Sequence, residues 1–169
     1  RPTWNWILSS DTALFGVIFD DMDEFTTTSS TYTPSNPLTD KSYTIKVRAK
    51  DAIGNWSAYG QSTVVVDITS AGIPVPSTNT PTKNTSVTWT WTAVSEASTY
   101  RLKLNGERKG DNNATSYTAT NLTEGNHTFE VASIDNAGNV SEYGKHILEV
   151  DLTAPPISKP STSTPTNNP

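Results

Sequence analysis

Short stretches of the chain alternate strictly between hydrophobic and polar residues. In VTWTWT (87–92), Val87, Trp89 and Trp91 fall on one face and the threonines on the other, and SYTIKVRAK (42–50) alternates in the same way. A side-chain period of two is what a half-buried β-strand requires, and no segment shows a convincing helical period of 3.6. The pattern therefore predicts an all-β protein.

Turn residues and aromatic residues extend this prediction. Clusters of Gly, Pro, Asn and Asp separate the alternating stretches, as expected for two antiparallel β-sandwiches of about seven strands each. The chain has five Trp, six Tyr and four Phe but no Cys, so its cores must form without disulfides. The alternation places Trp4, Trp6, Trp89 and Trp91 in those cores.

One ten-residue phrase occurs twice. DAIGNWSAYG at 51–60 returns 84 residues later as DNAGNVSEYG at 135–144, and PSTNTPT at 76–82 returns at the same offset as PSTSTPT at 160–166. Upstream the offset is 85, which matches Trp4 to Trp89. Agreement over most of the chain is typical of an internal structural repeat.

The repeat predicts the domain organisation. Residues 1–69 form a first sandwich without its own lead-in strand, residues 70–153 form a second, and residues 154–169 are the lead-in strand of a following repeat. Two repeats together span the 169 residues. Three interpretations remain open: a window on a long covalent array, a strand that residues 154–169 donate to the next molecule, and an arbitrary boundary.

Charge and hydropathy exclude some partners. The net charge is −5 and no run of Lys or Arg forms a basic stripe, so nucleic acid would be repelled. No apolar run approaches the roughly 20 residues of a membrane-spanning helix. Proline-rich junctions such as DITSAGIPVPSTNTPT (67–82) favour extended, fairly stiff spacers between the sandwiches.

A family resemblance rests on several of these motifs. The early Trp strand, the Y.L.L pattern at 100–104, TSYT..NL..G.HTFEV...D.AGN.S and VDLTAP resemble the fibronectin type III and Ig-like repeats of bacterial surface and secreted proteins. The resemblance implies a structural repeat unit of an extracellular or cell-surface stalk, fibre or adhesin, whose partners are neighbouring copies joined covalently or by strand addition. The alternative is an accessory module that binds polysaccharide or a host surface.

Nothing in the sequence favours catalysis. His127 and His146 fall where the first copy has Tyr43 and Ser62, so neither belongs to a shared constellation, and His127 alternates onto the inward face. There is no Cys nucleophile, no G-x-S-x-G and no H-E-x-x-H motif. We expect neither an enzyme nor a cofactor.

Two acidic features suit a cation. Asp67 and Asp151 follow the last strand of each copy, and with a neighbouring loop they are candidate Ca²⁺ ligands at the domain junctions. The run DDMDE (20–24) lacks the spaced oxygen ligands of a calcium loop and is better interpreted as a solvated hairpin tip.

The remaining candidates lie in turns. In the repeated phrase, Asp followed by Gly-Asn predicts a hairpin turn in which the Asp side chain accepts hydrogen bonds from backbone N–H groups two residues on. Asn113 and Asn126 lie in N-x-S/T sequons with an acidic residue two positions earlier, so they are candidate glycan sites. Trp56, whose counterpart is Val140, is the candidate sugar-binding platform.

Overall fold

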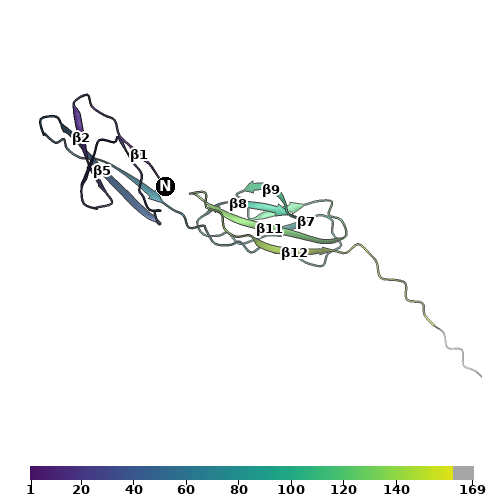
Figure 1. Ribbon diagram of the computed structural model, residues 1–169. Helices are drawn as coiled ribbons and strands as arrows, with labels where there is room; N and C mark the ends of the chain where they lie inside the picture. The colour runs from purple at the N-terminus through teal and green to yellow at the C-terminus, as the bar shows by residue number, and fades with distance from the viewer. Residues whose placement is uncertain (162–169) are drawn as a thin grey trace, which may run out of the picture. The chain divides into compact units, whose positions relative to one another are not determined.

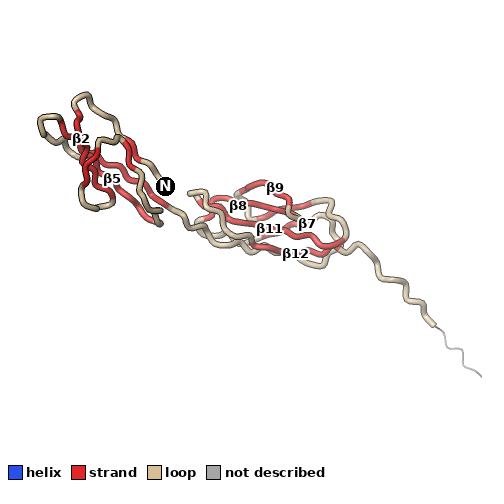
Figure 2. Tube along the Cα trace, in the orientation of Figure 1, coloured by secondary structure: helices blue, strands red, loops and turns tan. Residues whose placement is uncertain are grey.

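The computed structural model describes residues 1–161, and these residues form β-strands joined by turns and loops (Figure 2). Seven strand pairs within the sheets are antiparallel. The prediction of an all-β chain is confirmed.

Contacts along the chain divide it into two compact units. The first contains residues 1–70 with the short turn 135–139, and the second contains residues 71–134 with the chain that follows Asn139. Each unit holds one small and one large antiparallel sheet.

The first unit has six strands, among them β1, β2 and β5, which Figure 1 labels. They are β1 (Trp4–Asn5), β2 (Thr12–Phe19), β3 (Phe25–Thr27), β4 (Thr31–Tyr32), β5 (Lys41–Asp51) and β6 (Gly60–Val66). The small sheet pairs β1 with β4, and the large sheet has the order β3-β2-β5-β6.

The second unit repeats this plan. Its strands are β7 (Val87–Thr90), β8 (Ala97–Leu104), β9 (Glu107–Asn112), β10 (Ser116–Ala119), β11 (Gly125–Asp135) and β12 (Gly144–Val150). The small sheet pairs β10 with β7, and the large sheet has the order β12-β11-β8-β9.

Equivalent residues form equivalent strand pairs in the two units. Trp4 lies opposite Tyr32 in the first small sheet, and Trp89 lies opposite Tyr117 in the second. In the large sheets, Val47 faces Gly60 just as Val131 faces Gly144. The sequence offsets therefore correspond to positions in the fold.

Aromatic side chains fill the space between the sheets of each unit. Trp89 is completely buried and stacks on Phe129, with ring centroids 4.9 Å apart. Trp4 is also buried and meets Phe19 edge-on at 5.4 Å, whereas Trp6 is only half-buried. The predicted inward face is thus confirmed, except that Trp6 is less covered than its counterpart Trp91, which is 6% exposed.

A lead-in segment completes the second sandwich. Ser77 exchanges two backbone hydrogen bonds with Thr90 of β7, at 2.9 and 3.0 Å. Five residues later, Thr82 forms a parallel bridge to Val150 of β12. Between Ala71 and Ser77 the side chains of Pro74 and Pro76 are buried and that of Val75 is exposed, as in a strand. One segment therefore joins the edges of both sheets.

The corresponding segment after the second unit is only partly described. Residues 154–161 are exposed and unpaired, and Ile157 is 92% exposed. The rest of the expected lead-in strand, residues 162–169, lies outside the described residues. The expectation that residues 154–169 form a strand in a following repeat stays a prediction.

The lead-in segment lies close against Gly144 of β12. A Cβ at this position would overlap the backbone carbonyl group of Pro74. At the equivalent Gly60 of the first unit, a Cβ would meet only the carbonyl oxygen of Val47, at 3.9 Å. The two glycines occupy equivalent positions in the fold. Gly60 has room for a side chain, whereas Gly144 does not.

This difference predicts unequal effects of the same substitution. Gly144→Ala should lower the free energy of unfolding of the second unit by about 1–3 kcal/mol, because the methyl group must displace the Pro74 backbone. Gly60→Ala is the matched control and should change stability little. Urea unfolding followed by hydrogen exchange in each unit measures both, and equal destabilisation by the two variants would contradict the packing described.

Candidate interaction site

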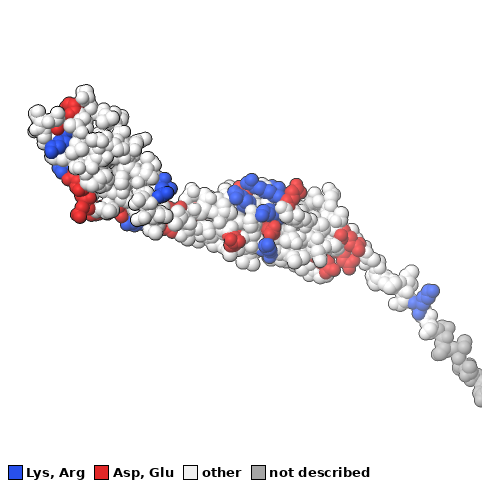
Figure 3. Space-filling model, in the orientation of Figure 1, with Lys and Arg blue, Asp and Glu red and all other residues white. Residues whose placement is uncertain are grey.

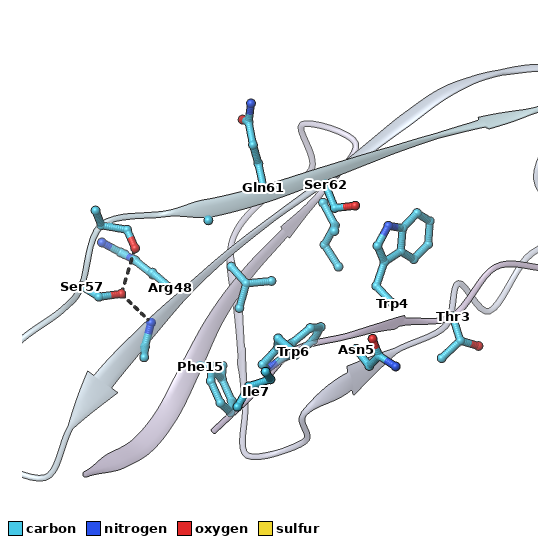
Figure 4. Close-up of a pocket in the computed structure, with 15 residues that line it drawn as sticks. Thr3, Trp4, Asn5, Trp6, Ile7, Phe15, Arg48, Ser57, Gln61 and Ser62 are labelled. Atoms are coloured by element: carbon cyan, nitrogen blue, oxygen red, sulfur yellow. Dashed lines mark hydrogen bonds between the residues drawn. The ribbon is translucent and has the colours of Figure 1, made fainter. Parts of the chain in front are cut away.

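An open groove of about 560 Å³ runs along the edge of the first unit. Trp4, Trp6 and Ile7 line one side, and Gln61 and Ser62 of β6 line the other (Figure 4). Its floor includes apolar side chains of the large sheet, among them Phe15. The groove therefore lies between the edges of the small and large sheets, and it offers apolar surface and strand backbone.

A charged cluster covers the outer face of the large sheet in the first unit. The Arg48 guanidinium donates from Nε to Oε1 of Glu24 at 2.7 Å, and it lies 4.3 Å from the ring centroid of Trp56. The hydrogen bond from Arg48 lowers the pKa of Glu24 below its ordinary value. A Cβ on Gly16 of β2 would overlap the Glu24 carboxylate. Gly16 therefore leaves the room that this ion pair occupies.

The run DDMDE is more than a solvated tip. Lys41 of β5 pairs with Asp20 at 2.6 Å, and Lys46 pairs with Asp21 at 3.3 Å. With Glu24 and Arg48, three acidic residues of the hairpin meet three basic residues of β5. The alternating basic residues along 42–50 include Lys46 and Arg48, so this alternation is a sequence signal for two of the three pairs.

Trp56 is half-buried beside this cluster. Arg48 covers one region of its ring, and the Lys50 ammonium lies 5.2 Å from the ring centroid. Tyr59, 41% exposed, lies 4.9 Å from Arg48 in the same group. Trp56 thus packs against cations as well as facing solvent, and its role as a sugar platform stays a prediction.

The repeated phrase forms the same capped turn in both of its copies. Oδ1 of Asp51 accepts hydrogen bonds from the backbone N–H groups of Ile53 and Asn55, at 3.1 and 2.8 Å. Asp135 accepts from Ala137 and Asn139, both at 2.9 Å. Gly54 and Gly138 have φ of 103° and 92°, the region that glycine reaches without strain. The predicted turn is confirmed.

These hydrogen bonds stabilise the ionised carboxylates. The backbone hydrogen bond from Asn55 and then its side-chain amide lower the pKa of Asp51. The Asn139 side chain is the largest cause of the lowered pKa of Asp135. The ionised form of each carboxylate is therefore stabilised by the geometry of its own turn.

The calcium candidates also lie in capped turns. Oδ1 of Asp67 accepts from the N–H of Thr69 at 3.2 Å, and Oδ1 of Asp151 accepts from the N–H of Thr153 at 3.0 Å. Among residues 1–161, no three His, Cys, Asp or Glu side chains gather closely enough to hold a metal ion. Calcium binding at these positions stays a prediction.

The glycan candidates are both exposed. Asn113 lies in the turn between β9 and β10, and Asn126 lies near the start of β11. Exposure satisfies the steric requirement for a glycan, and modification of either residue stays a prediction.

The two histidines have structural hydrogen-bond partners. His127 is 7% exposed, with Nε2 2.9 Å from the carbonyl oxygen of Thr123 and Nδ1 3.0 Å from the Asn105 amide. The indole N–H of Trp89 donates to Nδ1 of His146 at 3.3 Å. The prediction that His127 is an inward-facing residue is confirmed.

Acidic and basic side chains are interspersed on the face shown in Figure 3. Near β9, Arg101 and Arg108 share Asp111 at 3.3 and 2.9 Å, so this basic cluster carries its own counter-charge. Within the described part of the chain, no helix has the length and apolarity needed to cross a membrane.

Comparisons with known proteins bear on the fold. No protein-family model and no curated protein matches the chain. Fibronectin type III-like modules of Clostridium thermocellum CbhA match at a TM-score of 0.52 and 17% identity, over 91% of this chain and 88% of theirs. A two-domain fibronectin type III segment of chicken tenascin matches at a TM-score of 0.42 and 18% identity, over 88% and 91%.

The chain has a fibronectin type III-like fold. The predicted resemblance is confirmed at the level of architecture, which the CbhA modules share over most of the chain. Many unrelated functions use such a fold, so the function must be argued from the surfaces described above. Sequence reasoning missed the groove, because side chains far apart in the chain form it.

The capped turns predict how the stability of the protein depends on pH. A carboxylate whose folded pKa is lowered is stabilising above its unfolded pKa, near 3.8 for Asp, and this contribution is lost as pH falls through the folded pKa. The melting temperature should therefore fall between about pH 5 and about pH 2. The double variant Asp51→Asn, Asp135→Asn should melt several degrees lower than the native chain at neutral pH. Its melting temperature should then fall less on acidification.

Asp23→Asn, an exposed loop substitution, is the control and should retain the pH dependence of the native chain. Melting curves recorded by circular dichroism across this range measure the effect. An unchanged acid dependence in the double variant would refute the role given to the two carboxylates.

Proposed function

We propose that the chain is a structural repeat unit of an extracellular bacterial stalk, fibre or adhesin, with a mechanical rather than catalytic role. Its two fibronectin type III-like units would act as stiff segments that set the distance between whatever lies at the ends of the array. The extracellular location rests on the resemblance of the sequence motifs to surface and secreted repeats.

This proposal rests on the hydrogen bonds that restrain the chain just after the last strand of each unit. After β6, the Asp40 carboxylate accepts hydrogen bonds from the Ile68 N–H at 2.6 Å and from the Thr69 hydroxyl. After β12, the Thr153 hydroxyl donates to the Glu124 carboxylate at 2.8 Å. Asp40 and Glu124 are equivalent residues, 84 positions apart.

These hydrogen bonds restrict the conformation of the segment that follows the last strand of each unit. A flexible linker would have no such restraint. Asp67 and Asp151 add a further hydrogen bond to each exit, which they accept from the N–H of Thr69 and Thr153. The hydrogen bonds from Thr69 and then Ile68 lower the pKa of Asp40, so this contact is strongest with an ionised carboxylate. A chain that leaves each unit in a restrained direction suits an extended array.

The proposal predicts how the maximum dimension of the protein increases with the number of copies joined in one polypeptide. Polypeptides with one, two and three copies of the 169-residue sequence should gain a constant increment in maximum dimension by small-angle X-ray scattering. A flexible chain would grow roughly as the square root of its length. Asp40→Ala in every copy should shorten the increment, because it releases Ile68 and Thr69.

Asp23→Ala in every copy is the control and should preserve the increment. Square-root growth of the native polypeptides, or an Asp40→Ala variant with the native increment, would argue against a stiff repeat unit.

A binding function is the second candidate. The half-exposed Trp56 and exposed Tyr59 give the first unit an aromatic surface, whereas Val140 replaces Trp56 in the second. Aromatic faces of this kind stack on sugar rings, so the candidate ligand is a polysaccharide, of a substrate or of a host surface.

This candidate predicts retention on insoluble polysaccharide. The native chain should bind chitin or cellulose, Trp56→Ala should lose most of the bound fraction, and Trp56→Phe should retain much of it because a ring face remains. Val140→Ala at the equivalent position is the control. Equal pull-down of all four proteins, or none of the native chain, would reject the binding module.

A further inference from the structure

Four basic side chains lie on the outer face of the large sheet in the second unit. Arg101 and Lys103 alternate with buried residues of β8, so they point away from the core. Arg108 of β9 lies directly opposite Lys103 in the sheet. Lys145 of β12 lies directly opposite Glu130, which alternates with buried residues of β11. We call these four basic residues the basic face, and Figure 3 shows Lys and Arg gathered over β8 and β9.

An aromatic ring joins the two sides of the basic face. The Lys103 ammonium lies 4.0 Å from the ring centroid of Tyr143, which precedes β12. Since β11 lies between β8 and β12 in the sheet, this contact crosses the outer surface of β11. From β9 to β12 the basic face spans three interstrand spacings, or about 14 Å. A ligand that reaches all four cations must therefore be extended.

The basic face has more positive charge than its own carboxylates balance. Arg101 and Arg108 share the single carboxylate of Asp111, at 3.3 and 2.9 Å. Lys145 has one carboxylate partner, and Lys103 has none within residues 1–161. Four basic groups thus meet two carboxylates, although the net charge of the whole chain is −5.

The cations are also the outermost groups of this surface. The side chain of Lys145 is 64% exposed, whereas its partner Glu130 is 13% exposed. Arg108 is 59% exposed, against 29% for Asp111. The next acidic residue of β12 is Glu149, four residues beyond Lys145. A ligand that approaches the basic face therefore meets ammonium and guanidinium groups before it meets carboxylates.

The first unit shows that the fold does not require these cations. Its large sheet has the equivalent strand order, and Tyr59 is the counterpart of Tyr143. The residues equivalent to the basic face are uncharged or acidic: Gly16, Ile18, Asp23 and Gln61. The basic face is therefore specific to the second unit, and folding alone does not explain it.

The contact with Asp111 indicates which anion suits the basic face. Arg101 donates from Nε to Oδ1 of Asp111 and from Nη2 to Oδ2, both at 3.3 Å. A planar guanidinium binds a planar carboxylate in this two-point manner. The ring of Tyr143 beside Lys103 offers the apolar surface on which a sugar ring packs. Together these groups match an extended sugar polymer that carries carboxylates.

We infer that the basic face binds an acidic polysaccharide. Lys103 and Arg108 bind carboxylates of the polymer, and Tyr143 packs against a sugar ring beside Lys103. A nucleic acid suits this surface less well, because duplex DNA carries one charge per about 1.7 Å and the chain has a net charge of −5. In an acidic polysaccharide the carboxylates are separated by whole sugar rings, so a small excess of cations is enough.

This site is independent of the structural role proposed above and of the aromatic surface around Trp56. The scattering series and the chitin or cellulose pull-down involve none of the four cations. Failure of the basic face to bind would therefore leave both of those proposals as they stand, and their failure would leave this one.

Polygalacturonate is the probe, because its carboxylates can be masked without a change of backbone. In the presence of a chelator and at low salt, the native chain should bind immobilised polygalacturonate. The same polymer with its carboxylates methyl-esterified should bind little. High salt should remove the binding to polygalacturonate, because salt screens exposed charges.

A charge-matched pair of variants locates the site. The double variant Lys103→Gln, Arg108→Gln should weaken binding to polygalacturonate about tenfold, since two partly exposed ion pairs with the polymer are lost. Lys41→Gln, Lys46→Gln in the first unit changes the net charge by the same amount and should weaken binding little. Melting temperatures check that both variants fold.

Tyr143 distinguishes a sugar site from a general anion site. Tyr143→Ala should weaken binding to polygalacturonate several-fold, and Tyr143→Phe should bind like the native chain. Binding of polyglutamate, which has carboxylates but no sugar rings, should not change in Tyr143→Ala.

Four results would overturn the inference. They are a native chain that does not bind polygalacturonate, equal binding of the esterified polymer, equal losses in the two double variants, and tighter binding of single-stranded DNA than of polygalacturonate.

Discussion

Closure of two sheets over an aromatic layer is the constraint on which each unit depends. Trp89 stacks on Phe129 from the opposite sheet, and Trp91 meets Tyr100 edge-on at 5.4 Å. A buried aromatic side chain removes about 150–250 Å² from water, which contributes roughly 4–6 kcal/mol before the cost of ordering the chain is subtracted. With no cysteine in the sequence, this burial must hold the sheets together.

The same constraint explains the importance of the lead-in segment. A sandwich of two open sheets leaves strand edges and the margin of its core exposed unless a further segment covers them. In the second unit one segment pairs with β7 through Ser77 and with β12 through Thr82, so it closes both edges at once. In the first unit the equivalent margin is a groove lined by Trp4, Trp6 and residues of β6.

Charged residues stabilise the outer faces and turns without forming a reactive centre. The acidic hairpin 20–24 forms three ion pairs with basic residues of β5, and exposed ion pairs of this kind each contribute little to stability. The aspartates of the repeated turns have lowered pKa values because they accept hydrogen bonds from the turn itself. Asp40 and Glu124 act similarly on the segments that leave each unit.

The sequence by itself determined the features that depend on neighbouring residues. Alternation in VTWTWT placed Trp89 and Trp91 inside, and Asp51 with Gly54 and Asn55 specified a capped turn, because strand faces and turn hydrogen bonds are local. The repeat offset placed Gly60 and Gly144 at one position of the fold. Only the tertiary structure decided that Pro74 lies against Gly144 and that Arg48 joins Glu24 to Trp56, because these contacts depend on which strands become neighbours and on the space left between sheets.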